Sequence, residues 1–400
     1  MKKRELSKAL TIGAICITSY IVSYYMRNVL GVLTPEMLET GTYTKEYIGI
    51  LSSLYFLVYA GGQLINGITG DIIDPKKMIA GGLVLSGITS IAFVVLEARW
   101  FQMLCFGALG FGLSMLRGPL MKVISENTLP KYARNICVFF SAAGFLGAFI
   151  ASFLALIFEW KAAFVVSGII ALVVAITAYL LIGSLEKRGL VKYQLTKENR
   201  LTGMLGVFKI EKFMFYMFVG VLGEIATASI NFWTPTYLTE QLYFSTDNAN
   251  FIFSVMSAIK VVAPFIALGL LKIFGEKDVQ IVKYSFLASA VLFLLMVFCK
   301  NEWINVLLFL VAKISVGCAM AMLWSIYIPS LGKTGKVSSV NGILDCAGYI
   351  GAAIANAIFG FMVNIISWNG VIYIWSGLML SGYAAALAVS KEKHTAVQEG

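Results

Sequence analysis

Residues 9–34 read ALTIGAICITSYIVSYYMRNVLGVLT, an apolar run in which Arg27 is the one charged side chain. A run of about 20 apolar residues is long enough to cross the hydrocarbon core of a bilayer as a helix. A guanidinium at that depth costs at least ~2.5–3.5 kcal/mol on insertion scales unless it faces a polar cavity. We therefore expect Arg27 to face the protein interior, where an anion that binds and leaves would offset this cost.

The composition of the whole chain agrees with this interpretation. The 400 residues are 59% hydrophobic and 13% charged, whereas a soluble domain has about 25% charged residues. Only helices and closed barrels satisfy the backbone hydrogen bonds in lipid. Apolar runs of this length therefore predict an all-α membrane protein.

The net charge of +10 does not indicate nucleic-acid binding, because the basic residues cluster in alternate loops. This clustering is the positive-inside pattern of cytoplasmic loops. It predicts that both termini are cytoplasmic. It also predicts a multi-pass protein of the cytoplasmic (inner) membrane, whose helices contact the lipid bilayer. The loops rich in positive charge, besides the basic N-terminus, are 71–77, 122–134, 186–212, 272–283 and 333–336.

The hydrophobic pattern predicts about twelve transmembrane helices. Their expected ranges are 9–34, 46–69, 76–96, 100–125, 132–157, 161–184, 211–239, 247–274, 281–299, 303–329, 335–365 and 367–389. The polar segment 185–209 falls near the midpoint of the chain. It predicts a cytoplasmic linker between two pseudo-symmetric six-helix bundles, 1–184 and 210–400, as in transporters built from repeats. The alternative is a charged loop without architectural meaning.

Ionisable side chains deep inside these helices form a pattern. The third helix of each predicted triplet (76–96, 161–184, 281–299 and 367–389) has none, and the first helix of each triplet has one. This predicts that the third helices face lipid and that the first helices line a central cavity. The deep charges are Arg27, Arg117, Glu224, Lys260, Lys313 and Asp345.

Arg27 and Arg117 lie in the first half, where we expect no deep carboxylate to neutralise them. A guanidinium binds a carboxylate, sulfonate or phosphate through two parallel hydrogen bonds, so both are candidate ligands of an anion, with Lys313 as a third. The alternative for Arg117 is a position near the cytoplasmic end, from which its side chain snorkels into water.

The remaining deep charges are candidates for gating or proton coupling. Glu224 and Lys260 are expected at similar depth on adjacent helices and are therefore the expected ion pair, whereas a static buried pair is the alternative. Asp345 is a second candidate proton carrier, unless it and Lys313 lie near a membrane rim. Asp71, in the loop after the second helix, is expected to help latch one conformation on the cytoplasmic side.

Aromatic residues follow the same geometry. Tyr20 and Tyr24 precede Arg27 by seven and three residues, which places all three on one helical face. Tyr59 and Trp324 are further candidate donors to a ligand, with packing or a membrane-interface position as the alternative. The six cysteines show no metal-binding or disulfide spacing, and we expect neither a metal nor a cofactor.

Six stretches of the sequence resemble motifs of the organophosphate:phosphate antiporter family of the major facilitator superfamily, which includes glycerol-3-phosphate and hexose-phosphate transporters. The resemblance covers most of the chain. The matching stretches are Tyr20-x3-Tyr24-Tyr25-x-Arg27-Asn28, Gly70-Asp71-x2-Asp74-Pro75-Lys76, Phe232-Trp233-Thr234-Pro235-Thr236-Tyr237-Leu238, Asn341-Gly342, Gly348-Tyr349-Ile350-Gly351 and Trp368-Asn369-Gly370.

The chain also departs from this family. A second substrate-binding arginine is expected in the seventh helix, and Thr227 occupies that position here. A lysine of the second helix is replaced by Gln63, which becomes a candidate ligand, and the histidine of the fifth helix is absent because the only His is His394. These departures widen the expected substrate to sugar acids, carboxylates and sulfonates, as in the related anion:cation symporter family.

The sequence thus predicts a secondary active transporter of a small organic anion, working by alternating access as an antiporter or a proton-coupled symporter. Inorganic phosphate or protons are the expected coupling species, and a monomer is the expected state. The alternative is a transporter-like membrane receptor that senses a sugar phosphate without transport. An enzyme is not expected, because no catalytic constellation or nucleotide-binding loop is present.

Overall fold

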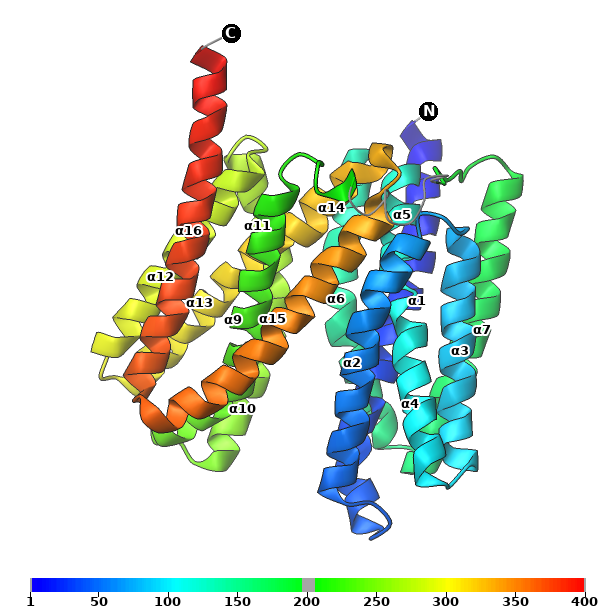
Figure 1. Cartoon of the computed structure of the whole chain (residues 1–400), viewed down its shortest axis with the longest axis horizontal. Coiled ribbons are helices and arrows are strands. Elements are labelled where there is room, and N and C mark those ends of the chain that lie inside the picture. The colour runs from blue at the N-terminus through cyan, green and yellow to red at the C-terminus, as the bar shows by residue number, and fades with distance from the viewer. Residues whose placement is uncertain (1, 196–205, 399–400) are drawn as a thin grey trace. The chain divides into compact units, whose positions relative to one another are not determined.

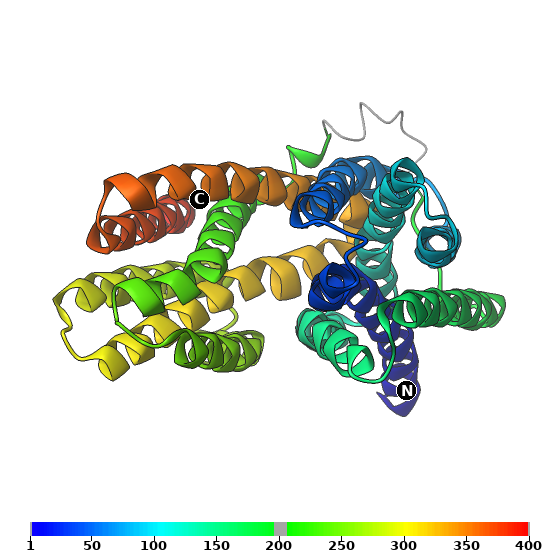
Figure 2. The same ribbon diagram turned by 90° about the horizontal axis from the view of Figure 1, so that it is seen from below.

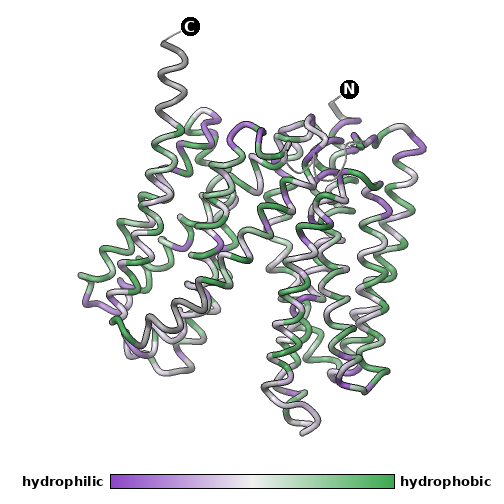
Figure 3. Tube along the Cα trace, viewed as in Figure 1, coloured by the Kyte–Doolittle hydropathy of each residue, from purple (hydrophilic) through white to green (hydrophobic). Residues whose placement is uncertain are grey.

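A computed structural model describes residues 2–195 and 206–398. In this part of the chain all regular elements are helices and there is no strand. Twelve helical segments are long and apolar enough to cross a membrane, which confirms the predicted all-α protein with twelve spans. Hydrophobic residues run along the helices, and hydrophilic residues gather mainly near their ends (Figure 3).

The helices before residue 196 follow one another with short connections (Figure 1). They are α1 (Lys2–Glu39), α2 (Lys45–Thr69), α3 (Pro75–Val95), α4 (Arg99–Ser114), α5 (Arg117–Asn127), α6 (Pro130–Ala155) and α7 (Trp160–Lys187).

The helices after residue 205 include three short irregular turns. They are α9 (Phe213–Glu240), α10 (Thr246–Ile259), η1 (Lys260–Val262), α11 (Ala263–Ile273), α12 (Asp278–Phe298), α13 (Glu302–Ala321), η2 (Met322–Tyr327), α14 (Ile328–Ser330), η3 (Leu331–Thr334), α15 (Val337–Ile365) and α16 (Trp368–Gln398).

Three of the predicted helices are interrupted, and proline explains two of the interruptions. Pro264 and Pro329 lack the N–H that would bond to the carbonyl four residues earlier. The chain accordingly forms a 3-10 turn at η1 and a π-helix at η2 just before these prolines. Between α4 and α5, Met115 and Leu116 form tighter i→i+3 hydrogen bonds of 3.1 and 3.3 Å.

The contacts divide the chain into two compact units. The first contains residues 1–209 and 328–346, and the second contains residues 210–327 and 347–400. The segment 328–346, which comprises α14, η3 and the start of α15, therefore belongs with the N-terminal helices. The predicted organisation into two six-helix bundles stays a prediction.

In the first unit, α1 packs against α6 and α7, and α3 packs against α4 and α7. Figure 2 shows α6 and α7 on either side of α1. The start of α15 approaches α2 closely, because a Cβ atom added at Gly342 would lie 2.6 Å from the Cα of Gly67. Glycine at both positions permits this backbone contact.

In the second unit, α12 packs against α13 and α16. Aromatic rings fill this core: the ring of Trp375 lies 5.7 Å from the ring of Phe293 and 5.7 Å from that of Phe309. The indole N–H of Trp375 donates to Ser229 at 3.1 Å. The buried polar end of the tryptophan is therefore satisfied within the unit.

Candidate functional site

The guanidinium of Arg27 is enclosed by aromatic rings. Its Cζ lies 5.6, 5.2 and 5.3 Å from the ring centroids of Tyr24, Phe56 and Tyr59. A guanidinium over a ring face is stabilised by about 0.5–2 kcal/mol, so these rings from α1 and α2 offset part of the cost of its depth. The Arg27 side chain is half-buried and lies beside this group of rings, which we call the aromatic cage.

Tyr20 and Tyr24 lie on the same face of α1 as Arg27. Their hydroxyl oxygens are 3.5 Å apart, and the ring of Tyr20 stacks on Phe140 of α6 with centroids 3.7 Å apart. Because α6 fixes the position of Tyr20, the face of α1 that carries Arg27 is held in one rotation.

Arg117 is paired with a carboxylate, contrary to our expectation. It donates from Nη1 to Oδ1 of Asp345, and Asn341 donates to the other carboxylate oxygen, Oδ2, at 2.9 Å. The sequence indicated no partner in the first half because Asp345 is 228 residues away. It enters the first unit only because the start of α15 packs there.

Both arginine environments adjoin α1. The hydroxyl of Tyr20 lies beside that of Tyr24, which contacts Arg27. Arg117 begins α5, and α5 packs against α1. The aromatic cage and the ion pair Arg117–Asp345 are thus parts of one polar region, which we call the arginine site.

Gln63 is a further predicted ligand of this unit. It is 1% exposed, and its side-chain nitrogen has no hydrogen-bond partner among the described residues. Its backbone carbonyl lies 2.3 Å from the position that a Cβ atom would take at Gly342. The residue is therefore placed where α2 meets the start of α15.

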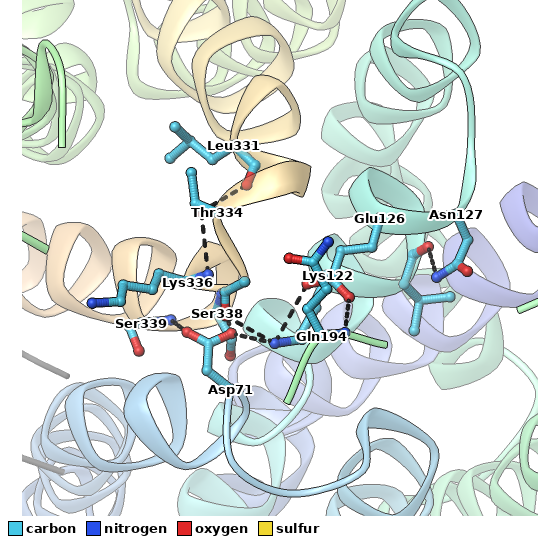
Figure 4. A network of polar contacts seen from close by, with 12 residues as sticks. Asp71, Lys122, Glu126, Asn127, Gln194, Leu331, Thr334, Lys336, Ser338 and Ser339 are labelled. Atoms are coloured by element: carbon cyan, nitrogen blue, oxygen red, sulfur yellow. Dashed lines mark hydrogen bonds and ion pairs between the residues drawn. The ribbon is translucent and has the colours of Figure 1, made fainter. Parts of the chain in front are cut away.

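Asp71 caps the start of α15 (Figure 4). Its carboxylate accepts hydrogen bonds from the backbone N–H groups of Ser338 at 3.2 Å and Ser339 at 2.8 Å. A carboxylate at a helix N-terminus satisfies backbone donors and interacts favourably with the helix dipole. This contact gives the predicted role of Asp71 as a latch a concrete geometry.

Lys122 completes this network. It was not among the site residues predicted from the sequence. Its Nζ lies 2.8 Å from Asp71 Oδ1, 3.1 Å from the Gly335 carbonyl and 3.5 Å from Glu126 Oε1. The side chain is 0% exposed and belongs to α5, so Lys122 is a buried helical residue rather than an exposed loop residue. The available signals were the Lys122–Glu126 spacing of four and the apolar residues on both sides of Lys122.

In the second unit, Lys313 is 2% exposed and lies over the ring of Phe253 at 5.2 Å. Its Nζ has no hydrogen-bond partner among the residues that the structure describes. Lys260 is within electrostatic range of both Lys313 and Glu224. The second unit thus brings two amines and one carboxylate together.

The predicted ion pair between Glu224 and Lys260 is not formed in the described residues, where no N–O distance between them is within 4.0 Å. The carboxylate of Glu224 instead lies against α15, and a Cβ atom at Gly348 would be 2.7 Å from Glu224 Cγ. Trp324 is half-buried in the π-helix η2 of the second unit.

Comparison with known proteins adds the family. A family model described as Major Facilitator Superfamily matches residues 16–350. The glycerol-3-phosphate transporter of Bacillus subtilis is 24% identical over 88% of this chain and 85% of its own length. The phosphoglycerate transporter protein of Salmonella typhimurium is 24% identical over 90% of this chain and 84% of its own.

The chain is also similar to a membrane sensor in part of its sequence and to a solved transporter structure in its fold. The membrane sensor protein UhpC of Salmonella typhimurium is 27% identical over 20% of this chain and 18% of its own length. Among solved structures, a bacterial homologue of the iron transporter ferroportin has a TM-score of 0.77 at 12% identity, covering 95% of this chain and 99% of that one. At this identity the likeness shows the fold alone.

Proposed function

The chain belongs to the major facilitator superfamily, and we propose that it carries a small organic anion across the cytoplasmic membrane by alternating access. The superfamily and the full-length relatives are transporters, not enzymes. The single observation that carries the proposal is Arg27, a guanidinium held at membrane depth by the aromatic cage.

The substrate class follows from the chemistry of the arginine site. A guanidinium binds phosphate and carboxylate in the same planar, two-point manner. Relatives named for glycerol 3-phosphate and phosphoglycerate favour an organophosphate. Thr227 and Gln63, which lack a positive charge, keep sugar acids, carboxylates and sulfonates within the class.

We assign Arg27 as the anchor of the anion and Arg117 as the second cation, with Lys313 as the candidate of the second unit. Further contacts to the substrate are assigned to Tyr20, Tyr24, Gln63 and Trp324, and Tyr59 is assigned to the same binding site through its ring, which lies against Arg27. Gating or proton coupling is assigned to Glu224, Lys260, Asp345 and Asp71. The contact between Asp71 and the start of α15 supports the last of these, because it would have to break when the cytoplasmic side opens.

The moving parts in this proposal are the predicted bundles 1–184 and 210–400, joined by the linker 185–209. The protein acts as a monomer with its termini in the cytoplasm. The transported anion is exchanged for inorganic phosphate or moves together with protons.

Uptake by the purified protein in proteoliposomes tests this function. The probes are labelled glycerol 3-phosphate, 3-phosphoglycerate, glucuronate, succinate and isethionate, preselected by thermal-shift screening, since a ligand that binds only the folded state raises its stability. We expect saturable uptake of at least one probe. Replacement Arg27→Ala should lower it at least about tenfold, because a charge-assisted hydrogen bond contributes about 1.5–3 kcal/mol.

Arg99→Ala is the matched control. Arg99 also lies over a tyrosine ring, 5.5 Å from the centroid of Tyr47, but it is exposed at the start of α4. Its loss should leave uptake within about twofold, as for most exposed positions. Full uptake of every probe by Arg27→Ala would refute the anchor role.

A second candidate function is a receptor that binds a sugar phosphate without moving it. The observation that favours it is the partial similarity to the membrane sensor UhpC. A receptor would give a thermal shift with hexose phosphates but no flux of any probe into proteoliposomes. Flux above that of protein-free vesicles would exclude this candidate.

A further inference from the structure

We infer that Asp345 is an internal counter-anion, which neutralises Arg117 when the empty transporter is closed to both sides of the membrane and so allows net movement of the anion in addition to exchange. This inference rests on the proposed function, because it concerns how the empty form of that same arginine site behaves. The two modes of transport that it distinguishes are obligatory exchange of one anion for another and net uptake of an anion.

The pair Arg117–Asp345 is built into the first unit. One carboxylate oxygen of Asp345 accepts from Arg117 and the other accepts from Asn341 at 2.9 Å. The side chain of Asp345 is 2% exposed and that of Arg117 is 14% exposed. One carboxylate oxygen of Asp345 therefore occupies a position at Arg117 that an oxygen of a bound carboxylate or phosphate would otherwise take.

The position of the pair ties it to the substrate site. Arg117 begins α5, which packs against α1, and α1 carries Tyr20, Tyr24 and Arg27. In the proposed function the anion bound by Arg27 also contacts Arg117, which already holds a carboxylate. The anion and Asp345 are then competitors for one guanidinium.

The electrostatic consequence concerns the return of the empty transporter. Alternating access passes through a state in which the site is closed to water from both sides. A buried charge that loses its partner costs about 3–5 kcal/mol. A binding site that contains only cations avoids this cost when an anion is bound. Without an anion, such a transporter changes slowly between its two facing states. It therefore exchanges one anion for another.

In this chain the carboxylate of Asp345 supplies the missing negative charge. The empty form can close with Arg117 neutralised by Asp345, and the loaded form can close with the charges of Arg27 and Arg117 balanced by the anion and by Asp345. Both forms therefore cross, and an anion can accumulate in vesicles that contain none at the start.

Replacement of Asp345 by Asn provides the test. The full chain is reconstituted, and influx of labelled glycerol 3-phosphate and 3-phosphoglycerate is measured into vesicles without internal anion and into vesicles preloaded with the same unlabelled anion. The membrane potential is held at zero with potassium and valinomycin, so that net charge movement does not limit the flux.

We expect the wild type to take up the anion under both conditions. Asp345→Asn should lower net influx far more than exchange, with the ratio of net influx to exchange falling at least about tenfold. It should also bind the anion more tightly, because the internal competitor is gone. A merely structural role of Asp345 would lower both fluxes together and leave their ratio unchanged.

Two variants keep the test valid if Asp345→Asn folds poorly. Asp345→Glu retains the carboxylate and should retain net influx. The double replacement Arg117→Gln with Asp345→Asn removes both charges. It should return the ratio of net influx to exchange toward the wild-type value, while both fluxes fall because Arg117 is lost as a ligand of the anion. Glu97→Gln, at an exposed carboxylate, is the matched control and should leave the ratio unchanged.

The inference is overturned if wild-type influx requires internal anion, or if Asp345→Asn keeps the wild-type ratio. Neither result affects the proposed function, which requires only that an anion is transported. The proposed function fails separately if the wild type carries none of the probes of the uptake panel under either condition.

Discussion

The buried ammonium group of Lys122 is expected to stabilise the folded protein. It is fully buried between Asp71, Glu126 and the Gly335 carbonyl, so its ammonium group is surrounded by oxygen atoms. Removing one member of such a group leaves the other charges buried without compensation. Its contribution to stability should therefore be large although the residue lies between apolar neighbours.

We expect Lys122→Met to lower the stability of the purified protein by about 3–5 kcal/mol, since Asp71 and Glu126 lose their shared cation. Thermal unfolding should show a midpoint lower by roughly 5–10 °C. Lys131→Met, at an exposed position of α6, should shift it by no more than about 1–2 °C. Equal midpoints for the two variants would contradict the role of Lys122.

The aromatic cage makes a prediction of a different kind, because ring faces and hydroxyl groups can be separated. Tyr59→Phe keeps the ring 5.3 Å from Arg27 and should retain anion affinity within about twofold, whereas Tyr59→Leu should weaken it several-fold. Equilibrium binding of the transported anion measures both. Loss of affinity in Tyr59→Phe alone would show that the hydroxyl, not the ring face, matters.

At the scale of elements, the sequence predicted the helices far better than their interruptions. Apolar runs report where a span lies, but they do not report hydrogen-bond pattern, so the break at Met115–Leu116 and the π-helix at Met322–Tyr327 were not foreseen. The partner of Arg117 was missed for a related reason. Asp345 is 228 residues away, and hydropathy contains no information about which distant helices meet.

The contact between α2 and α15 can be tested through its glycines. A Cβ atom at Gly342 would lie 2.3 Å from the Gln63 carbonyl and 2.6 Å from the Gly67 Cα, and backbone atoms cannot move away as a flexible side chain can. Gly342→Ala should therefore destabilise the protein by at least about 1–3 kcal/mol. The readout is the thermal unfolding midpoint.

Gly49→Ala on α2 is the matched control. Nothing lies within 4 Å of a Cβ atom at Gly49, and alanine favours the helix over glycine by about 0.8–1.0 kcal/mol. This variant should be neutral or slightly more stable. Destabilisation of both variants to the same degree would mean that close packing at Gly342 is not the cause.

At the scale of the whole molecule, the twelve spans are established, whereas their orientation stays a prediction from the basic loops. Fusion of a fluorescent reporter within the linker 185–209 should give a fluorescent protein, and a periplasmic phosphatase fused after Ala98 should be active. Interchanged activities of the two fusions would reverse the topology. The loop at 96–98 serves as the comparison because it contains no basic residue.

The proposed transport depends on Arg27, which binds the transported anion from within its aromatic cage. Equilibrium binding of that anion to the purified wild type, Arg27→Lys and Arg27→Ala tests this role. We predict at least about tenfold weaker binding for Arg27→Ala, and an intermediate affinity for Arg27→Lys, which keeps the charge but not the planar two-point contact. Wild-type affinity in a folded Arg27→Ala would contradict the account.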